Sequence, residues 1–233
     1  FNWLNKNGIS TEAIRIIEEE FTAGAFITTD RGDNQITGFN PGAMKYPSGF
    51  SLNQINPGSA VVIVSPGNLE DMQSYPRACK ERGIDYIFDP GQSLPVWGAA
   101  DLREAITGCR ILITNDYELD MVMQKTGMKK NDLLKLTRAI ITTLGELGSN
   151  VTTAEIDVRI PVVKARKVED PTGAGDSYRG GLISGLVRGN DIVECAKMGS
   201  VCASFAVECY GTQEYSFTKE EFCSRMDTCR LSV

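Results

Sequence analysis

Short apolar runs alternate with amphipathic stretches along most of the chain. The runs predict strands over residues 60–64, 85–88, 110–114, 139–143 and 158–163. Between them, apolar residues recur at helical spacing and predict helices over 69–82, 100–107 and 131–138. Apolar strands that alternate with helices are typical of a parallel sheet covered by helices on both faces. The pattern therefore predicts an α/β fold.

The two ends of the chain carry further elements. Residues 1–8 are predicted to form the last part of a helix, which Gly8 terminates. Residues 24–29 and 35–39 predict two short strands joined by the turn sequence Asp30–Asn34. Helices are predicted over 177–188, 191–207 and 220–225. Since no repeat or low-complexity linker divides the chain, we expect one α/β domain over 1–233, with a hairpin over 22–44 inside it.

Polar residues and glycines follow several of the predicted strands. Asn115 and Glu118 come after the strand at 110–114, and Gly145 comes after the strand at 139–143. Ligands of parallel α/β sheets bind beyond the carboxyl ends of the strands. With Asp176, these residues predict one shared site at that edge.

The amino-acid composition and net charge restrict the kinds of molecule that the protein is expected to bind. The chain has 233 residues, 42% of them hydrophobic, and a formal net charge of −6. An acidic chain of this kind argues against a nucleic-acid or anionic-membrane surface, and no apolar run approaches the ~20 residues that span a bilayer. We expect small-molecule partners, no nucleic acid and no membrane.

The cysteines and the missing histidine restrict the chemistry. The seven cysteines form no C-x-x-C pair and there is no histidine, so a zinc site would need other ligands. Reduced thiols fit a cytoplasmic enzyme. Cys195, Cys202 and Cys209 are seven residues apart, which predicts small hydrophobic residues on one helix face. Any general base must be a carboxylate, Lys, Tyr or Cys.

The run from Asp170 to Asp176, Asp-Pro-Thr-Gly-Ala-Gly-Asp, directly precedes an amphipathic helix. Unpaired N–H groups and the helix dipole favour an anion at such a terminus, and Gly173 and Gly175 allow a ligand to approach the backbone. Ordinary helix capping is the alternative. The chain has no Walker loop, and Tyr178 replaces the third glycine of a dinucleotide fingerprint.

This run resembles the second signature of the ribokinase-like (PfkB) carbohydrate and nucleoside kinases, D-T-x-G-A-G-D-x-[FY]-x-x-G, with Tyr178 and Gly181 at the last two fixed places. Residues 141–148 resemble the family's T-x-G-x-x-G loop, 115–118 its N-x-x-E motif, 211–213 its C-terminal nucleotide segment and 39–44 the end of its β lid. The signature, the T-x-G-x-x-G loop, the N-x-x-E motif and the C-terminal segment occur in the family's order, and the signature is similar to that of bacterial sugar/adenosine kinases.

The resemblance implies a ribokinase-like three-layer α/β/α sandwich with a small β lid, and an ATP- and Mg²⁺-dependent kinase. Asp176 would be the base, and the backbone N–H groups of Gly173, Ala174 and Gly175 would form an anion hole. The remaining implied residues divide by ligand: Asn115, Thr143, Gly145, Gly148 and Gly211 for the nucleotide, Glu118 for Mg²⁺, and Asp170 and Thr172 for a monovalent cation such as K⁺. A solvated carboxylate in the first turn of a helix would explain Glu118 as well, and capping or tight turns would explain Asp170, Thr172 and the glycines.

For the acceptor, the resemblance implicates Phe39 and Phe26 of the lid, with core packing as the alternative. We expect transfer to a primary hydroxyl of a nucleoside or sugar, adenosine or ribose foremost. A kinase for a sugar phosphate and a non-catalytic, ligand-binding regulatory relative are the alternatives. The family's opening strand and G-G-x-x-x-N segment, roughly 70–90 residues, are missing, and we expect that the sequence omits them. We also expect a homodimer through the lid hairpin.

Overall fold

A six-stranded sheet forms the centre of the computed structural model, which describes residues 1–29 and 35–229. The strand order is β3 (Val61–Val64), β4 (Asp85–Phe88), β5 (Ile111–Asn115), β6 (Ala139–Thr143), β7 (Ser149–Thr152) and β8 (Asp157–Ile160). The first four strands are parallel, as predicted, but β7 and β8 are antiparallel to their neighbours. The predicted parallel sheet is therefore found in these four strands and not in β7 and β8, because connections this short cannot make the crossover that parallel strands need.

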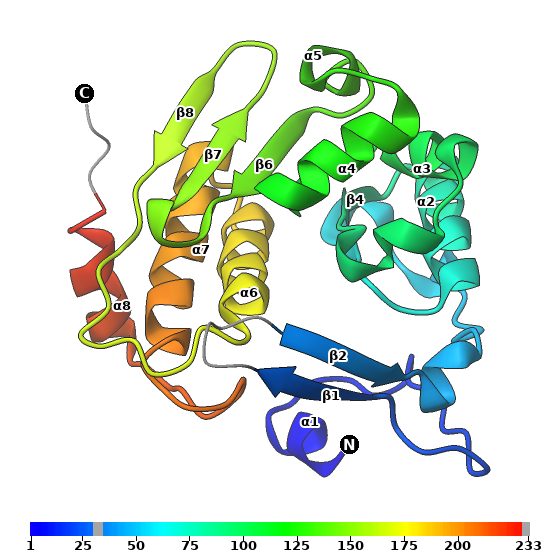
Figure 1. Ribbon diagram of the computed structural model, residues 1–233, viewed down its shortest axis with the longest axis horizontal. Coiled ribbons are helices and arrows are strands. Elements are labelled where there is room, and N and C mark those ends of the chain that lie inside the picture. The colour runs from blue at the N-terminus through cyan, green and yellow to red at the C-terminus, as the bar shows by residue number, and fades with distance from the viewer. Residues whose placement is uncertain (30–34, 230–233) are drawn as a thin grey trace.

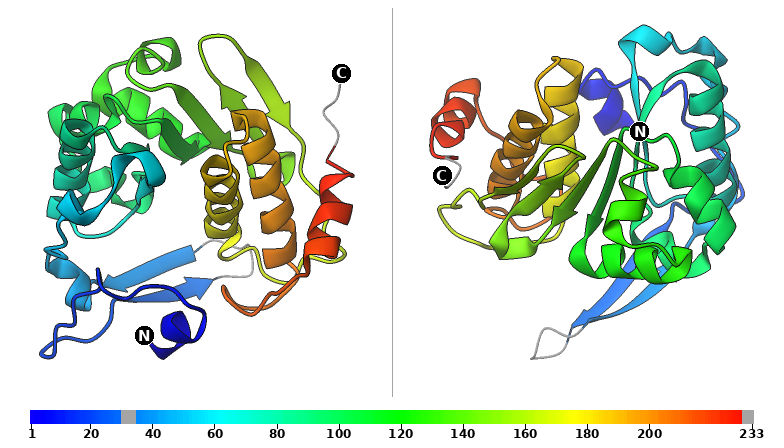
Figure 2. Two further views of the ribbon diagram at one scale, coloured as in Figure 1. Left: turned by 180° about the vertical axis from the view of Figure 1, so that it is seen from behind. Right: turned by 90° about the horizontal axis from the view of Figure 1, so that it is seen from above.

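Helices cover both faces of this sheet (Figures 1 and 2). One layer holds α2 (Leu69–Arg82), α3 (Ala99–Ile106), α4 (Asp116–Thr126) and the short α5 (Lys130–Leu133); the other holds α6 (Ala174–Val187), α7 (Ile192–Ala206) and α8 (Lys219–Met226). Neighbouring strand residues alternate between the layers: Phe88 belongs to the core beneath α2–α4, and Ile87 to the core beneath α6 and α7. The predicted three-layer α/β/α sandwich is confirmed.

Local capping explains which helix boundaries could be predicted. The Asn68 side chain accepts hydrogen bonds from two backbone N–H groups at the start of α2, and Gly83 ends the helix at a φ of +66°. The helix predicted over 131–138 is wrong in length, since α5 ends at Leu133. Thr137 donates to the carbonyl oxygens of Cys109 and Ala139, 3.1 Å away in each case. These bonds hold the segment before β6 against the segment before β5.

The predicted hairpin forms a separate two-stranded sheet, β1 (Gly24–Thr29) and β2 (Gln35–Asn40), near the first helix, α1 (Asn2–Lys6). Its predicted turn at 30–34 lies outside the described residues. Phe26 pairs with Gly38 and Phe39 with Ala25, so the two aromatic rings lie on opposite faces of the hairpin. Only one of them can face a ligand beneath it.

All seven cysteines are free thiols. Cys195 and Cys202 lie on α7 as predicted, but Cys209 lies beyond its end at Ala206. Within the described residues, no helix is both long and apolar enough to span a bilayer.

Candidate active site

A cavity of about 470 Å³ opens at the carboxyl edge of the parallel strands. Residues at the carboxyl ends of β3, β4, β5 and β6 or directly after them line it, together with the first turns of α6 and the end of the hairpin. Its lining includes Phe39, Met44, Ser65, Asp89, Gln92, Asn115, Glu118, Thr143, Gly175, Asp176 and Arg179. We call this cavity the central pocket. The predicted convergence of Asn115 and Asp176 is confirmed, whereas Gly145 lies outside the lining.

The loop before α6 turns sharply into the helix. Gly173, the N-cap, has a φ of +82°, and a Cβ there would lie 3.2 Å from the Thr212 side chain. The N–H of Ser177 is the first to bond within the helix, to the carbonyl of Gly173 at 2.9 Å. The N–H groups of Gly175 and Asp176 therefore lie in the turn that has no intrahelical acceptors. This geometry, beside the central pocket, suits an anion.

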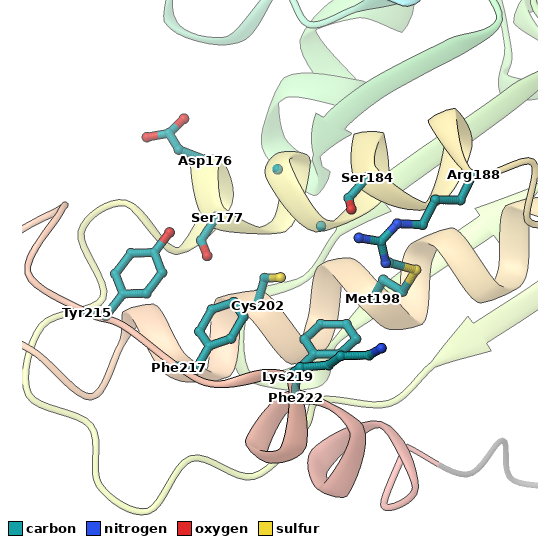
Figure 3. Close-up of a pocket in the computed structure, with 12 residues that line it drawn as sticks. Asp176, Ser177, Ser184, Arg188, Met198, Cys202, Tyr215, Phe217, Lys219 and Phe222 are labelled. Carbon is teal, nitrogen blue, oxygen red and sulfur yellow. The ribbon is translucent and has the colours of Figure 1, made fainter. Parts of the chain in front are cut away.

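Asp176 is exposed and carries no hydrogen bond or ion pair to any other residue in ranges 1–29 and 35–229. It lines the central pocket and also a second cavity of about 630 Å³ between α6, α7 and the segment at 215–222 (Figure 3). Apart from Asp176, the predicted site residues are absent from the second cavity, whose lining is largely apolar. The chemistry therefore concentrates in the central pocket.

Asn115 and Glu118 form a reciprocal capping box at the start of α4. The Asn115 N–H donates to the Glu118 carboxylate at 2.8 Å, and the Glu118 N–H donates to the Asn115 side-chain oxygen at 2.7 Å. The cap uses one carboxylate oxygen of Glu118 and leaves the other for a ligand. Both residues line the central pocket, so Glu118 caps the helix, a role that the sequence-based interpretation missed, and still faces the cavity.

Other predicted residues fix the backbone conformation around the pocket, through hydrogen bonds or as glycines. Asp170 accepts hydrogen bonds from the N–H groups of Thr172 and Gly211, at 2.9 and 3.1 Å. The Thr172 side chain, followed by these two N–H groups, holds the pKa of the Asp170 carboxyl below its usual value. Gly211 has a φ of +95°. At Gly148 a Cβ would lie 2.2 Å from the Ile160 carbonyl oxygen, so a close backbone approach requires glycine there.

The structure thus divides the predicted residues into two groups. Phe39, Asn115, Glu118, Thr143, Gly175 and Asp176 meet in the central pocket. Outside its lining lie Phe26, Gly145, Gly148, Asp170, Thr172, Gly173, Ala174 and Gly211, although the last five border the loop before α6. No cluster of three or more Asp, Glu, Cys or His side chains suited to a metal ion occurs in the part of the chain that the structure describes.

Two residues of the central pocket have no role in the sequence-based interpretation. Asp89, at the end of β4, and Arg179, on α6, form an ion pair with 2.5 Å between Oδ2 and Nε. The side chains are only 4% and 16% exposed. Burial raises the pKa of Asp89, the neighbouring guanidinium opposes this rise, and the negative charges of Glu118 and Asp176 add to it.

The chain is similar to several known proteins. The model of the pfkB family of carbohydrate kinases matches residues 1–219. A nucleoside kinase of Methanocaldococcus jannaschii is 36% identical over 230 residues, which are 98% of this chain and 75% of the relative.

Among solved structures, the nucleoside kinase of Burkholderia thailandensis in complex with inosine superimposes with a TM-score of 0.87 at 34% identity. The match covers 97% of this chain and 75% of that one. The structure of the same kinase described as its complex with ADP-inosine gives a TM-score of 0.87 and covers 98% of this chain and 71% of the other.

Proposed function

Since this chain belongs to the PfkB family of carbohydrate kinases, we propose that it transfers the γ-phosphoryl group of ATP to the primary hydroxyl of a purine nucleoside. The coarser prediction, an ATP-dependent sugar or nucleoside kinase of ribokinase-like fold, is confirmed by the matches. The observation that carries the finer proposal is the unpartnered Asp176 carboxylate beside the first turn of α6, inside a pocket that Phe39 also lines.

The reaction follows from the chemistry of these groups. Asp176 accepts the proton of the acceptor hydroxyl as its oxygen bonds to phosphorus and the bond to the leaving ADP oxygen breaks. A carboxylate is a weak base, which suffices because a loose phosphoryl transition state leaves the proton on the hydroxyl until late. The N–H groups of Gly173 and Gly175 are assigned to the phosphoryl oxygens, whose negative charge the helix terminus favours, whereas the Ala174 N–H, the third predicted donor, bonds to the Pro171 carbonyl oxygen at 3.2 Å.

The carboxylate set of the pocket suits Mg²⁺, which is usually held by one or two carboxylates, phosphate oxygens and water. Glu118 would hold it through the oxygen that the capping box leaves unused, with Asn115 nearby. When bound, the ion neutralises phosphate charge. Thr143, Gly145, Gly148 and Gly211 are assigned to the ATP side. A K⁺ site beside Asp170 and Thr172 stays a prediction, to be tested by replacing K⁺ with Na⁺ in the assay.

The aromatic ring of Phe39 favours a nucleoside over a free sugar, because a base offers it a flat apolar face. The prediction that Phe26 joins it conflicts with the hairpin register, which puts Phe26 on the other face. A phosphorylated acceptor is disfavoured, because such an acceptor would require a cluster of basic side chains, whereas Arg179 is the one basic side chain that lines the central pocket among the described residues.

The direct test is ADP release from Mg-ATP with adenosine, inosine, ribose, fructose and fructose 6-phosphate as acceptors. We expect turnover with a purine nucleoside and a loss of about 10²–10⁴-fold in Asp176→Asn. Asp116→Asn, in the first turn of α4 but outside the pocket, is the matched control. Turnover with fructose 6-phosphate alone would establish the sugar-phosphate alternative. ATP binding without any turnover would establish the regulatory one, and full activity in Asp176→Asn would remove the assigned base.

We also propose that the chain forms a homodimer through residues 22–44. Phe26 and Ile36 lie on the hairpin face opposite Phe39 and are 72% and 79% exposed. A two-stranded hairpin with such a face is marginal alone. Sedimentation at micromolar concentration should give a dimer that Phe26→Ser converts to a monomer, and a wild-type monomer would disprove the proposal.

A further inference from the structure

The ion pair between Asp89 and Arg179 joins two elements at the floor of the central pocket. Arg179 follows Asp176 by three residues, so the two side chains lie on the same side of the first turns of α6. Asp89 directly follows β4 and is nearly inaccessible, and its second carboxylate oxygen, Oδ1, has no hydrogen-bond partner within the described residues. A buried carboxylate with an unpaired oxygen is costly, which is typical of functional sites rather than of packing.

The guanidinium group lies against the backbone of Gly175. A Cβ at Gly175 would approach Nη1 of Arg179 to 2.7 Å, so the absence of a side chain there makes room for the charged group. Gly175 belongs to the helix turn whose N–H groups are assigned to the phosphoryl oxygens. Asp89 faces Nε of the guanidinium, which leaves the N–H groups on Nη1 and Nη2 as further donors.

The charges of the central pocket indicate what Arg179 can bind. Glu118 and Asp176 both lie close enough to raise the pKa of Asp89, so three carboxylates share the central pocket with one guanidinium. A polyphosphate that enters this pocket would be repelled by the carboxylates unless cations offset them. Arg179 is the one fixed side-chain cation in the described lining, and its planar donors match phosphoryl oxygens.

We propose that Arg179 binds the phosphoryl group during transfer, and that Asp89 positions its guanidinium. The inference rests on the proposed kinase reaction. As the acceptor oxygen bonds to the γ-phosphorus and the bond to the β,γ-bridging oxygen of ATP breaks, the acceptor proton passes to Asp176. Arg179 gains and loses no proton, and its charge offsets the negative charge on the transferred oxygens.

The first test separates binding from turnover. In the Asp176→Asn background, titration with Mg-ATP and with Mg-ADP measures the contribution of the γ-phosphoryl group. We expect Arg179→Ala to weaken ATP binding at least ~10-fold and to leave ADP binding within about threefold, whereas Arg188→Ala, at the far end of the same helix, should change neither. Equal losses for ATP and ADP would overturn the inference. This readout needs no turnover, so it remains decisive even where the proposed acceptor is wrong.

The second test uses kinetics with Asp176 intact. Arg179→Ala should lower kcat by about 10²–10³-fold, with little change in the acceptor KM, and added guanidinium ion should restore part of the rate. As a single variant, Asp89→Asn should lower kcat. In the Arg179→Ala background the same substitution should cause little further loss of kcat, because a positioning residue acts through the group it holds. Retained activity in Arg179→Ala, or full additivity of the two losses, would overturn the assignment.

Removal of one partner from a buried ion pair can unfold a protein. Thermal melting of each variant controls for this. Should Arg179→Ala fail to fold, the double variant Asp89→Asn/Arg179→Gln, which leaves no unpaired buried charge, carries both tests. An ATP-specific loss in a double variant that melts like the wild type supports the inference, and unchanged ATP binding in it overturns the inference.

Discussion

The helix that carries Asp176 and Arg179 packs against α7 at glycines, and one of these gives a sharp quantitative test. A Cβ built on Gly181 would lie 2.5 Å from the carbonyl oxygen of Met198 and 2.9 Å from the sulfur of Cys202. The first distance is about 0.9 Å short of the 3.4 Å at which ordinary van der Waals contact begins. Because the neighbouring atom is helix backbone, Gly181→Ala can be accommodated only if the two helices separate.

Overpacking of this kind costs about 1–3 kcal/mol, and alanine recovers up to ~1 kcal/mol through its helix propensity. We expect Gly181→Ala to lower the free energy of unfolding by about 1–2 kcal/mol, which corresponds to a fall in melting temperature of about 2–8 °C for a domain of this size. The matched control is Gly180→Ala. Gly180 is exposed and has no atom within 4 Å of its added Cβ, so this variant should melt at or slightly above the wild-type temperature.

The comparison is made by thermal unfolding and by urea titration of the two variants beside the wild type. Equal stability of Gly180→Ala and Gly181→Ala would refute the reasoning, because the two substitutions differ only in the helix face that receives the methyl group. Since α6 holds the first turn at the pocket, Gly181→Ala should also lose activity in proportion to any shift of that turn.

Three further outcomes follow from the site and its surroundings. Phe39→Ala should raise the acceptor KM by about 10-fold and leave the KM for ATP unchanged; an unchanged acceptor KM in steady-state kinetics would remove Phe39 from the site. Glu118→Gln keeps an oxygen for the capping box but loses the charge, so a Mg²⁺ titration of the rate should require about 10-fold more Mg²⁺. Burial alone would raise the pKa of Glu208, but its hydrogen bonds with Arg225 hold that pKa below the ordinary 4.5. The folded state therefore gains stability from the ionised carboxylate above pH 4.5 and loses it as the pH falls below, and Arg225→Met should flatten this part of a pH-dependent urea titration.

The sequence predicted the structure best where an element depends on residues close to it along the chain. Asn68 and Gly83 delimit α2 by capping, and the apolar runs at 85–88 and 139–143 match β4 and β6 residue for residue. The strand β7 was not predicted because Ser149–Thr152 is short and largely polar, and it becomes a strand only through its pairing with β6 and β8. Its identity is set by tertiary contact, which local propensity does not encode.

The same distinction explains the candidate site. Asn115, Glu118 and Asp176 could be proposed from the sequence because each lies at a strand end or a helix start that the local pattern marks. Asp89 and Arg179 could not be paired, since 90 positions separate them and each has an ordinary local interpretation, as a turn and as a helix residue. Their pairing exists only because parallel β4 delivers its carboxyl end to the first turns of α6. In this fold the local sequence therefore identifies groups that line the central pocket, whereas the buried ion pair beside them emerges only from the topology.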